Sequence, residues 1–140
     1  MKDLKRILLV EDDENDIKLT LTALEENNLA NRVDIARDGE EALDYLLRRG
    51  KFKTRPNEKP VVVFLDLKMP KVDGLEVLRQ IKSDKKLKLI PVVVLTSSKQ
   101  EKDIVESYEL GVNAYVVKPV DFSQFIDGIK KLGLGDYKRQ

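Results

Sequence analysis

Short apolar runs alternate with amphipathic helical patterns five times along the 140 residues, and this alternation constrains the fold most strongly. Each run is followed by large aliphatic or aromatic residues at helical spacing. Repeated strand-then-helix units favour an α/β domain with a doubly wound parallel sheet covered on both faces. The predicted strands are 6–11, 32–37, 61–66, 90–96 and 113–117, and the helices are one around 17–24, then 39–49, 74–83, 101–110 and 121–132.

The order of the strands is suggested by their composition. The runs 6–11, 61–66 and 90–96 are almost continuously apolar, as expected for strands buried on both faces. The run 32–37 alternates apolar and polar residues and 113–117 is short, so both are predicted to be edge strands. These features agree with the flavodoxin-like order 2-1-3-4-5, although periodicity alone does not prove it.

Carboxylates stand at the carboxyl ends of the first and third predicted strands. In a sheet of this order the strand order reverses between these two strands, and ligands bind in the crevice there. The first strand ends in Glu11, Asp12 and Asp13, and the third ends in Asp66. The chain has no histidine or cysteine, so oxygen ligands and a hard cation such as Mg²⁺, Ca²⁺ or Mn²⁺ are expected to neutralise them. Asp13 and Glu14 have an alternative interpretation as acids of the first helical turn.

A hydroxyl and an ammonium group are predicted at the same rim. Thr96 closes the fourth strand and Lys118 follows the fifth. Each has a simple alternative on its own, since threonine is common at turns and lysine before proline is often solvated. Together with the carboxylates they provide what a phosphoryl group beside a metal ion requires.

Composition excludes several classes. Twenty-six basic residues balance 25 acidic ones, which gives no case for nucleic-acid binding. No apolar run approaches the roughly 18 residues of a membrane span, and residues 1–6 lack signal-peptide character, so we expect a cytoplasmic protein. The absence of cysteine and histidine excludes zinc ribbons, thiol nucleophiles and Ser-His-Asp triads.

Four segments at the predicted strand ends carry a family resemblance: ILLVEDD at 7–13, DLKMPKVDG at 66–74, PVVVLTS at 91–97 and GVNAYVVKP at 111–119. In these motifs the chain resembles the receiver domains of two-component response regulators over essentially its whole length. The resemblance implies a receiver domain with five flanking helices over residues 1–132, a short C-terminal tail at 133–140, and no separate output domain.

The resemblance also implies residue roles. Asp66 would be the phosphoacceptor, in a reaction that depends on Mg²⁺, with Mn²⁺ as a substitute. The metal ligands would be Glu11, mainly through water, with Asp12, Asp66 and the main-chain carbonyl of Lys68. Thr96 and Lys118 would contact the phosphoryl group.

Three further features follow from the same resemblance. Tyr115 would be an aromatic switch that follows Thr96. The Lys118–Pro119 bond is a candidate cis peptide. The side chains of Lys68 and Ser98 occupy positions from which we predict that they tune the lifetime of the phosphorylated state.

The implied function is that of a single-domain response regulator, a phosphoacceptor signalling protein and not an enzyme. Its phosphodonor would be a histidine kinase or hybrid kinase, and its downstream protein target would bind the face of the fourth helix, fifth strand and fifth helix. The extended segment 50–59, with Ser97, Ser98 and 121–125, is similar to single-domain regulators paired with phytochrome-type kinases.

Other interpretations stay open. The segment 50–59 is either a solvated loop or a partner surface, and Phe122 and Phe125 belong to the core or to a homodimer surface. An aspartyl phosphatase would require the motif Asp-x-Asp beginning at Asp66, but Lys68 occupies the position of the second aspartate. The chain lacks the phosphate-binding loops that a P-loop enzyme or a flavin carrier would need. An adaptor that is never phosphorylated would not need the complete set of acidic residues, hydroxyl and lysine.

Overall fold

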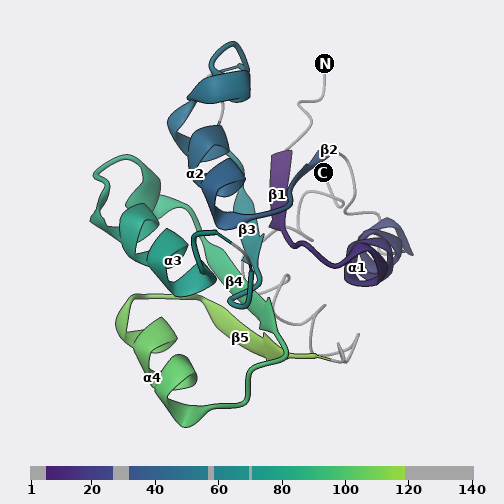
Figure 1. The fold of residues 1–140 in the computed structure, drawn as a ribbon, viewed down its shortest axis with the longest axis vertical. Helices are drawn as coiled ribbons and strands as arrows, with labels where there is room; N and C mark the ends of the chain where they lie inside the picture. Colours follow the sequence, from purple (N-terminus) through teal and green to yellow (C-terminus); the bar gives the residue numbers. More distant parts are fainter. Residues whose placement is uncertain (1–5, 27–31, 57–58, 70, 119–140) are drawn as a thin grey trace, which may run out of the picture.

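A computed structural model describes residues 6–26, 32–56, 59–69 and 71–118. Its centre is a five-stranded sheet with the order β2-β1-β3-β4-β5, and every neighbouring pair is parallel (Figure 1). This confirms the predicted fold class and strand order. The strands are β1 (Arg6–Val10), β2 (Arg32–Ala36), β3 (Val62–Leu65), β4 (Val92–Thr96) and β5 (Ala114–Val117).

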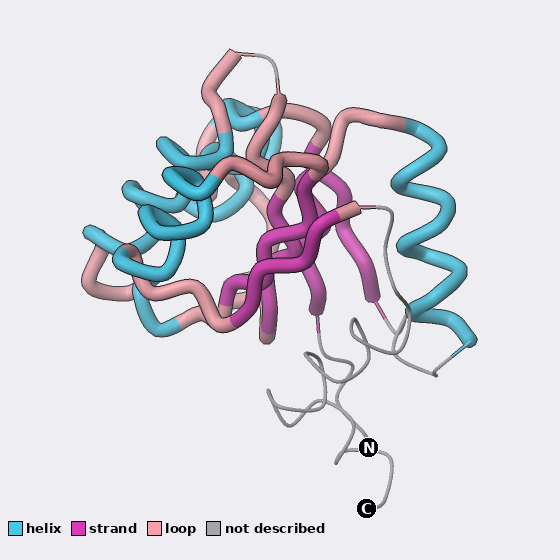
Figure 2. Tube along the Cα trace, turned by 90° about the horizontal axis from the view of Figure 1, so that it is seen from below, coloured by secondary structure: helices cyan, strands magenta, loops and turns pink. Residues whose placement is uncertain are grey.

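Helices cover both faces of the sheet. Figure 2 shows α1 on one side of the sheet and the other described helices on the opposite side. The predicted helix at 121–132 and the tail at 133–140 lie outside the described residues. The helices are α1 (Glu14–Glu26), α2 (Gly39–Leu47), α3 (Gly74–Ser83) and α4 (Glu101–Glu109), with 3₁₀ turns η1 (Gly50–Phe52) and η2 (Leu87–Leu89).

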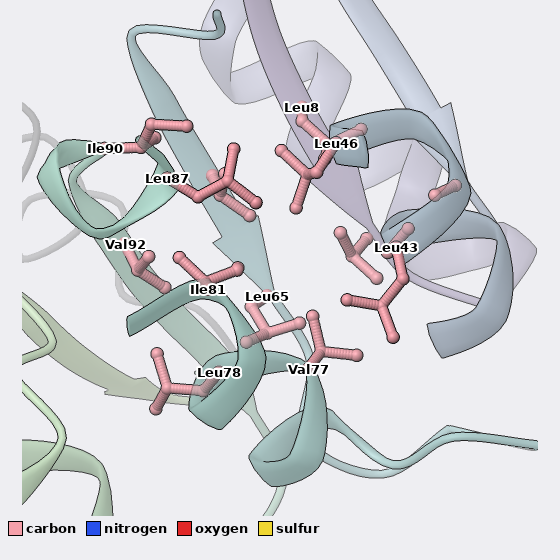
Figure 3. Packing of buried hydrophobic residues seen from close by; sticks show 14 of the residues in the cluster. Leu8, Leu43, Leu46, Leu65, Val77, Leu78, Ile81, Leu87, Ile90 and Val92 are labelled. Atoms are coloured by element: carbon pink, nitrogen blue, oxygen red, sulfur yellow. The ribbon is translucent and has the colours of Figure 1, made fainter. Parts of the chain in front are cut away.

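Two apolar clusters hold these layers together, one on each face of the sheet. Alternate residues of a strand point to opposite faces, so Leu8 packs under α2 and α3 while Leu9 packs under α1. Figure 3 shows side chains of α2, α3 and η2 converging on those of the central strands in the larger cluster. This burial fixes the strand ends, and with them the positions of the polar residues that follow.

Some element boundaries differ from the prediction. The fourth strand begins at Val92 rather than residue 90, because Ile90 ends η2 and Pro91 lacks an N–H for the sheet. The second helix ends at Leu47 rather than residue 49, because Arg48 adopts a left-handed conformation with φ of 57°.

The segment after α2 packs onto the domain. The Phe52 ring meets the Tyr45 ring edge-on, with 5.2 Å between centroids. Arg55 lies over the same Tyr45 ring at 4.2 Å and donates a 2.7 Å hydrogen bond from Nε to the Tyr45 carbonyl. The described part of 50–59 is therefore attached to α2 rather than forming a fully solvated loop.

Within the described part of the chain, no helix has both the length and the apolar character that crossing a membrane requires.

Candidate functional site

The carboxyl ends of β1 and β3 place Glu11 and Asp66 side by side. Val10 pairs with Leu65 in the register of these two strands, so the next residue of each chain emerges at the same edge. The Asp66 N–H donates to the Val10 carbonyl at 3.0 Å, and the Glu11 N–H donates to the Ala36 carbonyl at 2.9 Å. The sheet therefore fixes the main chain at both acidic positions.

Glu11, Asp12 and Asp66 form an acidic cluster whose geometry fits a divalent cation. Each offers a carboxylate oxygen, and these oxygens lie within 4.8 Å of one another. Glu11 and Asp66 are buried and Asp12 is exposed at the rim. A donor set made only of oxygen suits hard divalent cations, so these residues form a candidate metal site.

Lys118 places its ammonium against this cluster. Its Nζ donates to Glu11 at 2.6 Å and to Asp16 at 2.7 Å, with Asp66 farther away at 3.4 Å. The Lys118 N–H donates to the Thr96 carbonyl at 2.8 Å, which attaches this position to the end of β4. Lysine and carboxylates therefore meet as expected, from chain segments about a hundred residues apart.

Burial and the close contacts of the cluster shift the pKa values of Glu11 and Lys118. Burial, reinforced by the Asp66 charge, raises the pKa of Glu11 to about 7, although the hydrogen bond from Lys118 opposes the rise. Burial acts to lower the pKa of Lys118, but hydrogen bonds to Asp16 and Glu11 outweigh it and raise that pKa above its usual value. The ammonium stays charged, whereas Glu11 is ready to take up a proton.

Asp16 is a site residue to which the sequence assigned no role. Asp13 caps α1, since its Oδ1 accepts the Asp16 N–H at 2.9 Å, and Glu14 pairs with Arg37 on the surface. The capping interpretation thus describes Asp13. The sequence does contain a signal for Asp16. It lies in the first turn of α1, and this helix begins three residues after Glu11, so its first turn lies near the acidic end of β1.

Gly74 lets the start of α3 pack closely against the main chain of Asp66 and Leu67. A Cβ at this position would lie 2.4 Å from the Asp66 carbonyl oxygen and 2.5 Å from the Leu67 Cα, so no larger residue fits unshifted. The Gly74 N–H donates to the Leu67 carbonyl at 2.9 Å. The Lys68 N–H donates to Asp66 Oδ1 at 3.1 Å and orients that carboxylate.

The hydroxyl side of the rim contains Thr96, Ser98 and Tyr115. Thr96 is fully buried, and its Oγ1 accepts the Ser98 N–H at 3.3 Å. The Tyr115 hydroxyl donates to the Ser98 carbonyl at 3.0 Å, so the two predicted switch residues contact the same loop residue. Pro119 lies outside the described residues, and the predicted cis peptide with it.

Comparison with known proteins identifies the type of domain. The family model of the response regulator receiver domain matches residues 7–130. The chain is 41% identical over 133 residues to response regulator Rcp1 of Synechocystis sp. (strain ATCC 27184 / PCC 6803 / Kazusa), covering 93% of this chain and 89% of Rcp1.

Solved structures give the same result. Bacteriophytochrome response regulator RtBRR superposes with a TM-score of 0.85 at 60% identity, covering 94% of this chain and 79% of that one. The Mn²⁺-bound form of Rcp1 gives 0.78 at 41%, covering 91% and 88%. The phosphorylated cyanobacterial phytochrome response regulator RcpA gives 0.80 at 44%, covering 93% and 91%.

Proposed function

Because the chain belongs to the response regulator receiver domain family, we propose that Asp66 accepts a phosphoryl group from a phosphohistidine of a partner kinase. The observation that carries this proposal is the Asp66 carboxylate itself. It is buried at the end of β3, 3.4 Å from the Lys118 ammonium and within 4.8 Å of carboxylate oxygens of Glu11 and Asp12. The protein is then a signalling phosphoacceptor rather than an enzyme acting on a separate substrate.

We assign Mg²⁺ to the acidic cluster, with Mn²⁺ as a substitute. Glu11, Asp12, Asp66 and the main-chain carbonyl of Lys68 would hold it. The oxygen donors within 4.8 Å support this assignment, as does the Mn²⁺-bound form of the relative Rcp1. When bound, the ion supplies charge neutralisation for the transferring phosphoryl oxygens.

The residues of the chain itself perform the transfer. An Asp66 carboxylate oxygen forms the new bond to phosphorus, while the bond from phosphorus to the kinase histidine breaks and its electron pair returns to the imidazole. Lys118 pairs with the arriving phosphoryl oxygens, which requires it to loosen its contacts with Glu11 and Asp16. The Lys68 N–H holds the other Asp66 oxygen in place.

Phosphorylation then changes the preference between two packings of the β4–α4 loop. The added charge and acceptor oxygens attract the Thr96 hydroxyl, and Tyr115 follows through the shared loop residue Ser98. The face of α4, β5 and the predicted helix at 121–132 would carry this change to a downstream protein. A homodimer through that face is the alternative.

We assign the kinase partner to the phytochrome type. Two relatives, RtBRR and RcpA, are phytochrome response regulators by name, at 60% and 44% identity.

A small phosphodonor tests the assignment of Asp66. Incubation with acetyl phosphate and Mg²⁺ should add one phosphoryl mass to the wild type, and EDTA should prevent it. Asp66→Asn should stay unlabelled. Asp73→Asn is the matched control, because Asp73 is an exposed aspartate of the same loop and asparagine still caps α3. Equal labelling of Asp66→Asn and the wild type would contradict the proposal.

A further inference from the structure

Asp103 is a buried carboxylate on the first turn of α4, outside the acidic cluster. Its side chain is 5% exposed and accepts a 2.5 Å hydrogen bond from the Ser98 hydroxyl. Lys68 Nζ lies 3.6 Å from the same oxygen, the one cation that the described residues place within ion-pair distance. A buried charge is costly unless it is paired, so the Ser98 hydroxyl and this partly exposed lysine together compensate the Asp103 carboxylate.

Asp103 connects the two loops that contain the predicted switch. Through Lys68 it reaches the loop that orients the Asp66 carboxylate. Through Ser98 it reaches the loop residue that contacts both Thr96 and Tyr115. A cavity of about 410 Å³ is lined by Lys68 and Asp103 together with residues of the loop after Asp66, so the lysine side chain borders open space.

We propose that Asp103 is a positioning residue that holds the Lys68 ammonium away from the phosphoryl group and so shortens the lifetime of phosphorylated Asp66. This inference rests on the proposed function. In hydrolysis, water attacks phosphorus, the bond to the Asp66 oxygen breaks, and that carboxylate leaves with the electron pair while the water proton passes to solvent. A lysine beside the phosphoryl oxygens hinders the approach of this water, and Asp103 competes with the phosphoryl group for that lysine.

The test measures the decay of the phosphorylated protein after rapid removal of acetyl phosphate, by intact mass. Asp103→Asn keeps the size and an oxygen acceptor for Ser98 but removes the charge. Decay should slow about three- to fivefold, the range of a partly exposed ion pair. Lys68→Gln should speed decay about twofold, and the double variant should decay like Lys68→Gln. Glu101→Gln, which removes an exposed charge from the same helical turn, should change nothing.

The dependence on Lys68 separates positioning from a general structural role. An equal effect of Asp103→Asn in the presence and absence of Lys68, or faster decay in the single variant, would overturn the proposal. Should Asp103→Asn lose its fold by circular dichroism, Lys68→Gln still decides, because unchanged or slower decay in it contradicts the competition. Failure of the wild type to become phosphorylated would instead overturn the proposed function.

Discussion

Replacing Glu11 by glutamine should make the metal-free protein more stable at pH 8. The Glu11 side chain is 3% exposed, and its pKa rises from 4.5 to about 7 mainly through burial. Between these values the folded state binds more protons than the unfolded state, so stability falls as pH rises from 4.5 to about 7. At about 1.4 kcal/mol for each factor of ten, the penalty is about 3 kcal/mol above pH 7.

Part of this penalty returns in the variant. Glu11 accepts hydrogen bonds from Lys118 Nζ and, at 3.2 Å, from the Asp13 N–H. Glutamine has a single acceptor oxygen, so one of these donors faces an NH₂ group at a cost of about 1 kcal/mol. We therefore expect a net gain of about 2 kcal/mol at pH 8, which shrinks and changes sign as the pH approaches 5.

Urea unfolding followed by circular dichroism, in EDTA at pH 5, 6.5 and 8, measures this difference. Glu14→Gln is the matched control, since Glu14 is an exposed neighbour paired with exposed Arg37 and should show no such gain. The reasoning is refuted if Glu11→Gln is as stable as the wild type or less stable at pH 8, or if the gain does not depend on pH.

Two further outcomes are expected. Mg²⁺ binding should release close to one proton at pH 6 and almost none above pH 8, because the Glu11 pKa is about 7. Calorimetry in buffers of different ionisation enthalpy measures this release, and no release at pH 6 would contradict the prediction. Gly74→Ala should lower the stability by about 2 kcal/mol and slow phosphorylation, since the alanine Cβ would lie 2.4 Å from the Asp66 carbonyl oxygen. Urea unfolding and labelling rates that match the wild type would contradict this prediction.

The sheet was predictable because its signal is local and repeated. Apolar runs with flanking helical patterns gave the strands, and the contrast between buried and alternating runs gave the edges. Boundaries were harder, because they depend on single main-chain events. The left-handed Arg48 ends α2, and η2 occupies residues that precede β4, neither of which follows from periodicity.

The acidic cluster and Lys118 were predictable because parallel strands bring their carboxyl ends to one edge. Asp16 and Asp103 were not, because both are helical acids of a type that is usually solvated. Their importance depends on which cation lies opposite. Lys118 reaches Asp16 across the sheet, and Lys68 reaches Asp103 from the neighbouring loop. Such pairings depend on side-chain reach in three dimensions rather than on spacing in the sequence.

The balance of charge at the site differs from that of a simple salt bridge, because carboxylates outnumber the lysine that pairs with them. Among the described residues, four carboxylates, those of Glu11, Asp12, Asp16 and Asp66, gather near the single Lys118 ammonium. One lysine cannot neutralise all four, and the Asp66 charge adds to the burial that raises the pKa of Glu11 to about 7. A proton on Glu11 and a divalent cation are therefore alternative ways to relieve the same repulsion. Acidification should therefore weaken metal binding. In the proposed transfer an ionised Asp66 acts beside the metal, so phosphorylation should fall together with metal affinity below pH 7.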